Sequence, residues 1–266
     1  MARPYMHPRH VQDRHLQDDT VTGVKAPAKL EDRVHGERLA RSMRDGEIGV
    51  IRLGLVFEGT SWSIHKTLME SECENLQWNE GLASEYFIGS EHSSEAVDLF
   101  VEWLYTQEYC ERQGLAQDFA VPSLRTIILP DGKLKNRNLM DWAIKAAFAC
   151  WELGASLRAK NFQNYAMKRL FEAFSRPLSQ LLVPQLLQHT YFFCKRFPRA
   201  SWQLQHLIQD IILRNWSDET VVNHRGDWYP IINSCQAFGD TFHKAKHQDV
   251  VKRREKKLSL ADYLIH

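Results

Sequence analysis

The residues best suited to chemistry stand close together, in the stretch from Ser61 to Glu74. Within it, His65 could bind a metal or act as a general base, since imidazole does both near neutral pH. However, no cysteine or carboxylate stands at metal-ligand spacing from it. The favoured interpretation is a histidine that packs where a strand passes into a helix.

Three glutamates follow this histidine, and paired carboxylates can share the acid and base roles of an active site. Here they alternate along a predicted helix edge, so they would point in different directions, with no apolar pocket to raise a pKa. We therefore expect a solvated face at Glu70, Glu72 and Glu74. The neighbouring serines lack the glycine context of a nucleophile elbow. They are Ser61, Ser63 and Ser71.

Cysteine usage indicates a reducing compartment. The five cysteines are widely spaced, odd in number and form no C-x-x-C pair, which argues against both a disulfide framework and a zinc cluster. They are Cys73, Cys110, Cys150, Cys194 and Cys235. The N-terminus lacks the apolar core of a signal peptide, and no apolar run could span a bilayer. We expect an intracellular chain, in cytoplasm or nucleus, without membrane contact.

The overall composition is that of a globular protein, with 44% hydrophobic and 25% charged residues among 266. A formal net charge of +1 gives no global attraction to nucleic acid, so no nucleic-acid partner is expected. One basic run, Val251–Lys257, stands out near the C-terminus. It is either a nuclear-localisation patch or a solvated helical tail, and the sequence leaves both open.

The predicted elements begin with two strands. Residues 48–57 are rich in β-branched side chains and end at a turn, and residues 61–65 alternate polar and apolar, which together predict a hairpin. Short helices are expected over 66–72 and 74–82, and the aromatic stretch 85–88 predicts a third strand.

The best-marked helix follows Ser93 and Ser94, because a serine N-cap precedes apolar residues spaced three and four apart. A second apolar face predicts burial on two sides. A polar connection over 111–138 follows, with an additional strand predicted at 124–129. Helices fill the rest of the chain, and the first of them is predicted to end near Gly154.

Two stretches carry a family likeness. The sequence Trp62-Ser63-Ile64-His65-Lys66-Thr67-Leu68-Met69, followed by Ser71, resembles the BTB/POZ motif F-x-V-H-K-x-L-L-x-x-S. The sequence Ala96-Val97-Asp98-Leu99-Phe100-Val101-Glu102-Trp103-Leu104-Tyr105-Thr106 resembles the third helix of that fold, most closely in its fungal form. A third echo, Phe148–Gly154 with Leu157 and Asn161, is similar to the helix pair of the family.

The resemblance implies an α+β chain with a BTB/POZ fold, in which a helical cluster and a small sheet precede an all-helical C-terminal extension. The expected parts are a disordered segment over 1–45 with a short helix at 37–44, the domain over 46–170, and the extension with its basic tail over 171–266. The motif core comprises Ile64, His65, Lys66, Leu68, Phe100, Trp103, Leu104 and Tyr105.

The sequence also departs from the family. Leu76 replaces a common phenylalanine, Gln107 replaces the closing glycine, and the connection over 111–138 is longer than usual. Neither Asp45 nor Glu47 aligns clearly with the acidic residue that lines the family's dimer groove, so homodimerisation is an open question.

In function, the resemblance implies an adaptor or scaffold that binds other proteins, with no catalysis and no cofactor. Family partners are BTB domains and cullins. The sequence Trp78-Asn79-Glu80 is similar to the apolar-any-Glu pattern with which some BTB adaptors engage a cullin, although a core tryptophan at a helix end is the favoured interpretation. Trp78, Glu80 and Tyr86 form the candidate partner interface. The alternatives are a nuclear, self-associating, transcription-linked module and a small enzyme.

Overall fold

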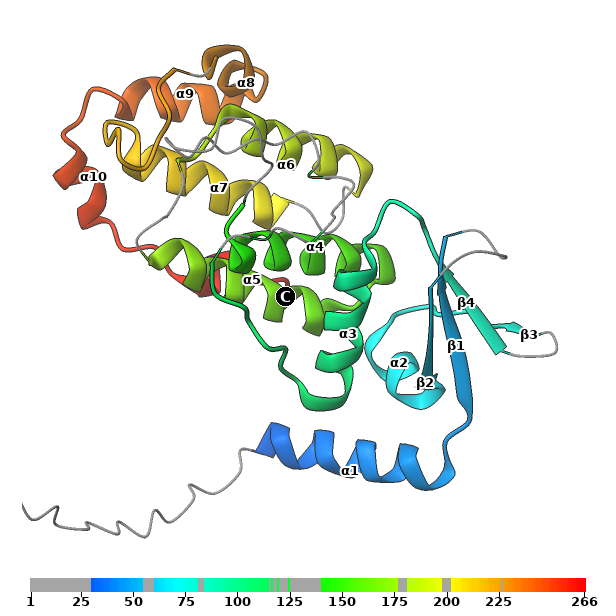
Figure 1. The fold of residues 1–266 in the computed structure, drawn as a ribbon. Coiled ribbons are helices and arrows are strands. Elements are labelled where there is room, and N and C mark those ends of the chain that lie inside the picture. The colour runs from blue at the N-terminus through cyan, green and yellow to red at the C-terminus, as the bar shows by residue number, and fades with distance from the viewer. Residues whose placement is uncertain are drawn as a thin grey trace, which may run out of the picture. The chain divides into compact units, whose positions relative to one another are not determined.

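The computed structural model describes residues 30–54, 60–80, 84–114, 116, 119, 124, 140–176, 181–197, 202–225 and 227–266. The protein is mixed α+β, as predicted, with far more helix than sheet (Figure 1). Residues 1–37 and 38–266 form separate compact units, and the second contains the sheet and the helices from α2 to α10. The strand predicted over 124–129 lies outside the described residues except at Leu124.

Among the described residues, the sheet has four strands in the order β2-β1-β4-β3. Strands β1 (Ile48–Leu53) and β2 (Ser61–His65) pair antiparallel, so the predicted hairpin is confirmed, although residues 55–59 are outside the described part. The predicted third strand is β4 (Ser84–Ile88), which runs parallel to β1. The two-residue β3 (Asn79–Glu80) extends the edge beside β4.

Helix α3 (Ser94–Thr106) forms as predicted. The Ser93 hydroxyl accepts a hydrogen bond from the amide of Ala96 at 3.1 Å, which satisfies one of the unpaired amides of the first turn. Apolar side chains on both of its predicted faces are buried, so the helix has protein on two sides. They are Val97, Leu99, Phe100, Trp103 and Leu104.

The prediction of a second short helix over 74–82 is wrong. Helix α2 (Lys66–Glu72) ends because Cys73 is extended and Asn75 has a φ of 59°, a left-handed value that no α-helix continues through. The chain then runs irregularly into β3. Leu76 and Trp78, which suggested the helix, pack against the core from this irregular segment.

The short helix predicted at 37–44 is confirmed, because it lies within α1, which spans Leu30–Asp45. The prediction of disorder is wrong for residues 30–36 and 45, which also belong to α1. In the second unit, the Ser42 hydroxyl lies 2.5 Å from the Thr67 hydroxyl, and Arg38 forms a 3.6 Å ion pair with Glu72. Leu39 also packs on the core. These contacts reach α2, so the composition of the segment alone could not reveal them. Residues 1–29 lie outside the described part.

Helices α4 (Trp142–Leu157) and α5 (Lys160–Ser175) form a close pair, and α4 is buried along nearly its whole length. The prediction that this helix ends near Gly154 is wrong, because α4 continues to Leu157. The next residue, Arg158, has a left-handed φ of 54°. Gly154 instead faces α5, where a Cβ atom would lie 2.6 Å from the Gln163 Cγ. This glycine permits close helix packing rather than a turn.

The regular elements in the described part of the C-terminal extension are helices, apart from a single bridge between Leu182 and Val222. Its elements are α6 (Pro184–Arg196), α7 (Trp202–Asn215), α8 (Tyr229–Asn233), α9 (Gln236–Ala245), α10 (Val250–Glu255) and a 3-10 turn (Leu260–Tyr263).

Polar contacts tie the extension to the helix pair. His189 of α6 is hydrogen-bonded to the buried Glu152 of α4. The C-terminus returns to α5, where the Asn164 side chain donates to the Ile265 carbonyl at 3.0 Å and accepts from its amide at 2.7 Å (Figure 1). The extension therefore folds as a continuation of the α4–α5 pair.

Candidate interaction surface

His65 lies at the junction of β2 and α2 and makes structural contacts. Its Nδ1 lies 2.8 Å from the Tyr105 hydroxyl, and its backbone amide donates to the same oxygen at 3.2 Å. The two rings also meet edge to face, with centroids 5.8 Å apart. These contacts support the interpretation of His65 as a packing histidine, and they join the first motif to the second.

A second bond joins the same two motifs. The Trp62 indole donates to the Asp98 carboxylate at 2.7 Å, from β2 to α3. Between the two bonds the apolar motif residues are buried at no more than 2% exposure, which excludes them as contact residues for a partner. They are Ile64, Leu68, Phe100, Trp103 and Leu104.

Lys66 is held in place on the sheet. Its ammonium donates to the Glu47 carboxylate at 2.7 Å, and this hydrogen bond and the lysine's charge lower the pKa of Glu47. The same ammonium lies 5.8 Å from the centre of the Trp78 ring, within cation–π range. Lys66 therefore positions its neighbours and also places a charge beside the partly exposed ring of Trp78.

Of the predicted interface residues, the structure brings Trp78 and Tyr86 together. Their rings meet edge to face with centroids 6.3 Å apart, and both are partly exposed. Trp78 is fixed from below by Gly49 of β1, where a Cβ atom would lie 2.5 Å from its ring, and its indole donates to Glu70 at 2.8 Å. We call Trp78 and Tyr86 the aromatic patch. The third predicted residue, Glu80, pairs through its backbone with Ser84, and its side chain lies outside the described part.

The glutamates near His65 serve separate structural contacts. Glu70 accepts from Trp78, whereas Glu72 accepts from Asn161 of α5 at 3.0 Å. Ser71 donates to the Leu68 carbonyl at 2.8 Å, a contact within its own helix. These bonds point in different directions, so the residues do not converge on one reacting atom.

The thiols with shifted pKa values are the reverse of activated nucleophiles. Burial raises the pKa of Cys73 to about 12 and also raises the pKa of Cys150. At the exposed Cys110, a hydrogen bond to Glu102 and the charge of that carboxylate raise the pKa. Each environment disfavours the thiolate, which is the reactive form. Cys194 has no described side chain.

Within the described part of the chain, no group of three or more His, Cys, Asp or Glu residues is placed to hold a metal ion. The same part contains no helix with the length and apolar character needed to cross a bilayer.

A hollow beside α3 was not predicted from the sequence. It has a volume of about 410 Å³, an acidic wall of Glu95, Asp98 and Glu102, and an apolar wall that includes Phe119 and Trp142. The three carboxylates stand at i, i+3 and i+7, so the spacing within the predicted helix could have indicated an acidic face. The apolar wall comes from beyond the helix and could not be predicted locally.

The basic run Val251–Lys257 is only partly solvated. Arg253 is buried, and its guanidinium donates to the Ala245 carbonyl at 3.1 Å and to the Ser217 hydroxyl at 2.9 Å. Arg254 donates to Asn215 and Asp218. The prediction of a solvated tail is therefore wrong for Arg253, since it holds the turn between α9 and α10 in place.

Comparison with known proteins adds no family: no protein-family model matches this chain, and no curated protein matches it significantly.

Proposed function

We propose that the chain is a BTB-type protein-interaction module, an adaptor or scaffold that binds other proteins through its exterior. The order of the described elements supports this: a hairpin, a helix, the short strand β3, the strand β4 parallel to β1, a buried helix and then a helix pair. The sequence predicts the same order for residues 46–170, except for the second short helix over 74–82, which the structure does not have.

The observation that carries the proposal is the bonding between the two motif segments. Trp62 with Asp98, and His65 with Tyr105, join residues of the first motif to residues of the second across 36 and 40 positions. Such bonds explain why both motifs occur together in one chain. They also give the motif residues a structural role, which leaves binding to the exposed residues around them.

The partner class that we propose is a cullin N-terminal domain, with the aromatic patch as its contact. Interfaces are rich in Trp and Tyr, because each ring offers a large apolar area and a polar tip. Lys66 adds a charge beside the patch, and Glu80 follows Trp78 at the spacing of the adaptor pattern.

A pull-down of the full chain with a purified cullin N-terminal domain tests this. Trp78→Ala and Glu80→Ala should each weaken capture, by about tenfold if either is a hot spot. Trp202→Ala is the matched control, because Trp202 is a 48% exposed tryptophan on α7. Circular dichroism of each variant checks folding. This check matters most for Trp78→Ala, because the Trp78 ring packs against the core.

If the chain does not capture the cullin domain, the cullin partner is ruled out. The same holds if neither Trp78→Ala nor Glu80→Ala changes the amount captured. A mass measurement in solution then addresses the other family mode. A concentration-dependent dimer would support BTB self-association, whereas a monomer without cullin binding would contradict the adaptor proposal.

The alternative of a nuclear, self-associating module depends on the basic run as a localisation signal. Arg253 is buried and the partly exposed Arg254 is paired with Asp218, so two cations of the run are engaged by the protein itself, whereas such signals need accessible cations. The adaptor is therefore the function that we propose.

A further inference from the structure

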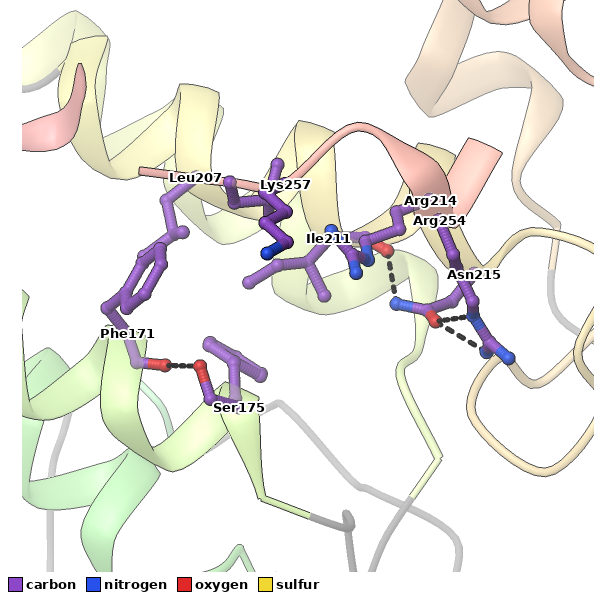
Figure 2. Close-up of a pocket in the computed structure, with 10 residues that line it drawn as sticks. Phe171, Ser175, Leu207, Ile211, Arg214, Asn215, Arg254 and Lys257 are labelled. Carbon is purple, nitrogen blue, oxygen red and sulfur yellow. Dashed lines mark hydrogen bonds between the residues drawn. The ribbon is translucent and has the colours of Figure 1, made fainter. Parts of the chain in front are cut away.

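A pocket of about 430 Å³ opens in the C-terminal extension, between α5, α7 and the chain that follows α10. Its partly exposed apolar lining comes from Phe171 and Phe174 of α5 and from Leu258. The buried Leu207 and Ile211 of α7 lie behind it, and Figure 2 shows them beside Phe171. Large apolar side chains at a surface opening mark a binding site when they are grouped in this way.

Three cations complete the lining: Arg214, Arg254 and Lys257. Arg254 is fixed by hydrogen bonds to the Asn215 amide oxygen at 2.6 and 3.0 Å and to Asp218 at 2.6 Å. Arg214 donates to the Lys256 carbonyl at 2.8 Å. Both guanidinium groups are thus held by neighbours before any ligand arrives, which lowers the entropic cost of binding.

Lys257 is the most exposed member of the set, and Figure 2 shows its ammonium directed into the space between Phe171 and Ile211. A long alkyl stem with a terminal charge can cover apolar surface and still reach an anion. Lys257 can therefore contact both parts of a ligand that is apolar at one point and anionic at another.

The charge of this lining is unbalanced. No carboxylate lines the pocket, and Asp218 neutralises only Arg254. Among the residues that the structure describes, neither Arg214 nor Lys257 takes part in an ion pair. An apolar floor beneath uncompensated cations favours a ligand that is apolar at its centre and anionic around it.

We propose that this pocket binds an acidic peptide segment of a partner protein, with one bulky apolar side chain seated against Phe171, Phe174 and Leu258. Cations from two separate elements, α7 and the end of α10, favour a ligand with several carboxylates along a chain. A single carboxylate would meet either Arg214 or Lys257 and leave the charge of the other without a counter-charge. The pocket shares no residue with the aromatic patch, so the test of this site does not depend on the outcome of the cullin test.

Fluorescence anisotropy with the full chain tests the site. The probe is a labelled nonapeptide with a central Leu-Phe pair flanked by glutamates. Its controls replace every Glu by Gln, or Leu-Phe by Ser-Ser. We expect the parent peptide to bind at low salt, binding to weaken as salt rises, and both control peptides to lose most of it.

Lys257→Glu should weaken binding of the parent peptide about tenfold, since an attraction becomes a repulsion. Lys252→Glu is the matched control, because it is an exposed lysine of the same basic run that does not line the pocket. It should change binding less than about twofold. Arg214→Gln removes the cation that α7 contributes to the pocket and should also weaken binding of the parent peptide. Melting curves verify that the variants fold.

Three results would overturn the proposal: no binding of the parent peptide at low salt, equal effects of Lys257→Glu and Lys252→Glu, or equal binding of the Gln-substituted peptide. Competition with decanoate adds a fourth. Decanoate has one carboxylate on one alkyl chain. If it displaces the peptide at equal concentration, the pocket accepts a lipid-like anion and the peptide assignment is wrong.

Discussion

Replacing Gly154 with alanine tests how closely α4 and α5 pack. The added Cβ would lie 2.6 Å from the Gln163 Cγ, 3.2 Å from the Gln163 backbone nitrogen and 3.3 Å from the Phe162 Cδ1. Gln163 is 3% exposed and Phe162 is fully buried, so neither can swing into solvent to make room. The helices would have to separate by a few tenths of an ångström.

Two opposing effects decide the sign. Alanine is favoured over glycine inside a helix by about 1 kcal/mol. Forcing a methyl group into a filled core costs about 1–3 kcal/mol. Because the nearest contacts include backbone and two buried side chains, we expect the cost to win. The net loss in the free energy of unfolding is about 1 kcal/mol, or a fall in Tm of about 2–4 °C.

Thermal unfolding followed by circular dichroism measures this change, and a double-mutant cycle identifies its cause. Gln163→Ala removes the Cγ atom that the new methyl group would meet, so Gly154→Ala should cost less in that background. A Gly154→Ala variant as stable as the parent, or a cycle in which the two changes simply add, would refute the close packing.

Two further predictions concern polar contacts. Tyr105→Phe removes the hydroxyl that lies 2.8 Å from the His65 Nδ1, and should lower stability by about 1–2 kcal/mol in urea unfolding; an unchanged midpoint would show that the bond contributes nothing. For Asp218, hydrogen bonds from Thr220 and then Arg254 lower the pKa from 3.8 to about 2. The folded state thus disfavours the proton, so this stabilisation is complete above about pH 4 and is lost as the pH falls toward about 2. Its size should stay below about 1 kcal/mol, because solvent screens the pair. The stability advantage of the parent over Asp218→Asn should therefore shrink between about pH 6 and about pH 3, and a constant difference would contradict the shift.

Features set by neighbouring residues could be predicted from the sequence. The start of α3 depends on the bond from the Ala96 amide to the Ser93 hydroxyl, three positions away, and the spacing of its apolar residues is visible in the chain. The hairpin likewise depends on adjacent strands. The packing role of His65 was predicted as well, but its partner Tyr105, 40 positions away, emerges only from the fold.

Features set by distant contacts could not be predicted. A glycine near a helix end usually marks a C-terminal cap, and nothing near Gly154 in the sequence indicates that Gln163 presses against it. Residues 74–82 carried a helical pattern, but Trp78 satisfies it by packing on Gly49 of β1. Arg214 and Arg254 line one pocket although they stand far apart in the sequence, so only the return of the chain past α7 unites them.

The same division explains why the fold class of this chain is easier to predict than its partner. Residues that make a pattern recognisable, such as Ile64 and Phe100, are fully buried and describe only how the chain packs on itself. A partner contacts the partly or fully exposed side chains, such as Trp78 and Lys257. The core packs in the same way whatever partner these side chains bind, so the core pattern does not identify the partner. Substitutions of exposed side chains such as Lys257 should therefore change binding while leaving unfolding nearly unaltered, whereas changes at core positions should do the opposite. Measuring both quantities for each variant is what separates a contact residue from a packing residue here.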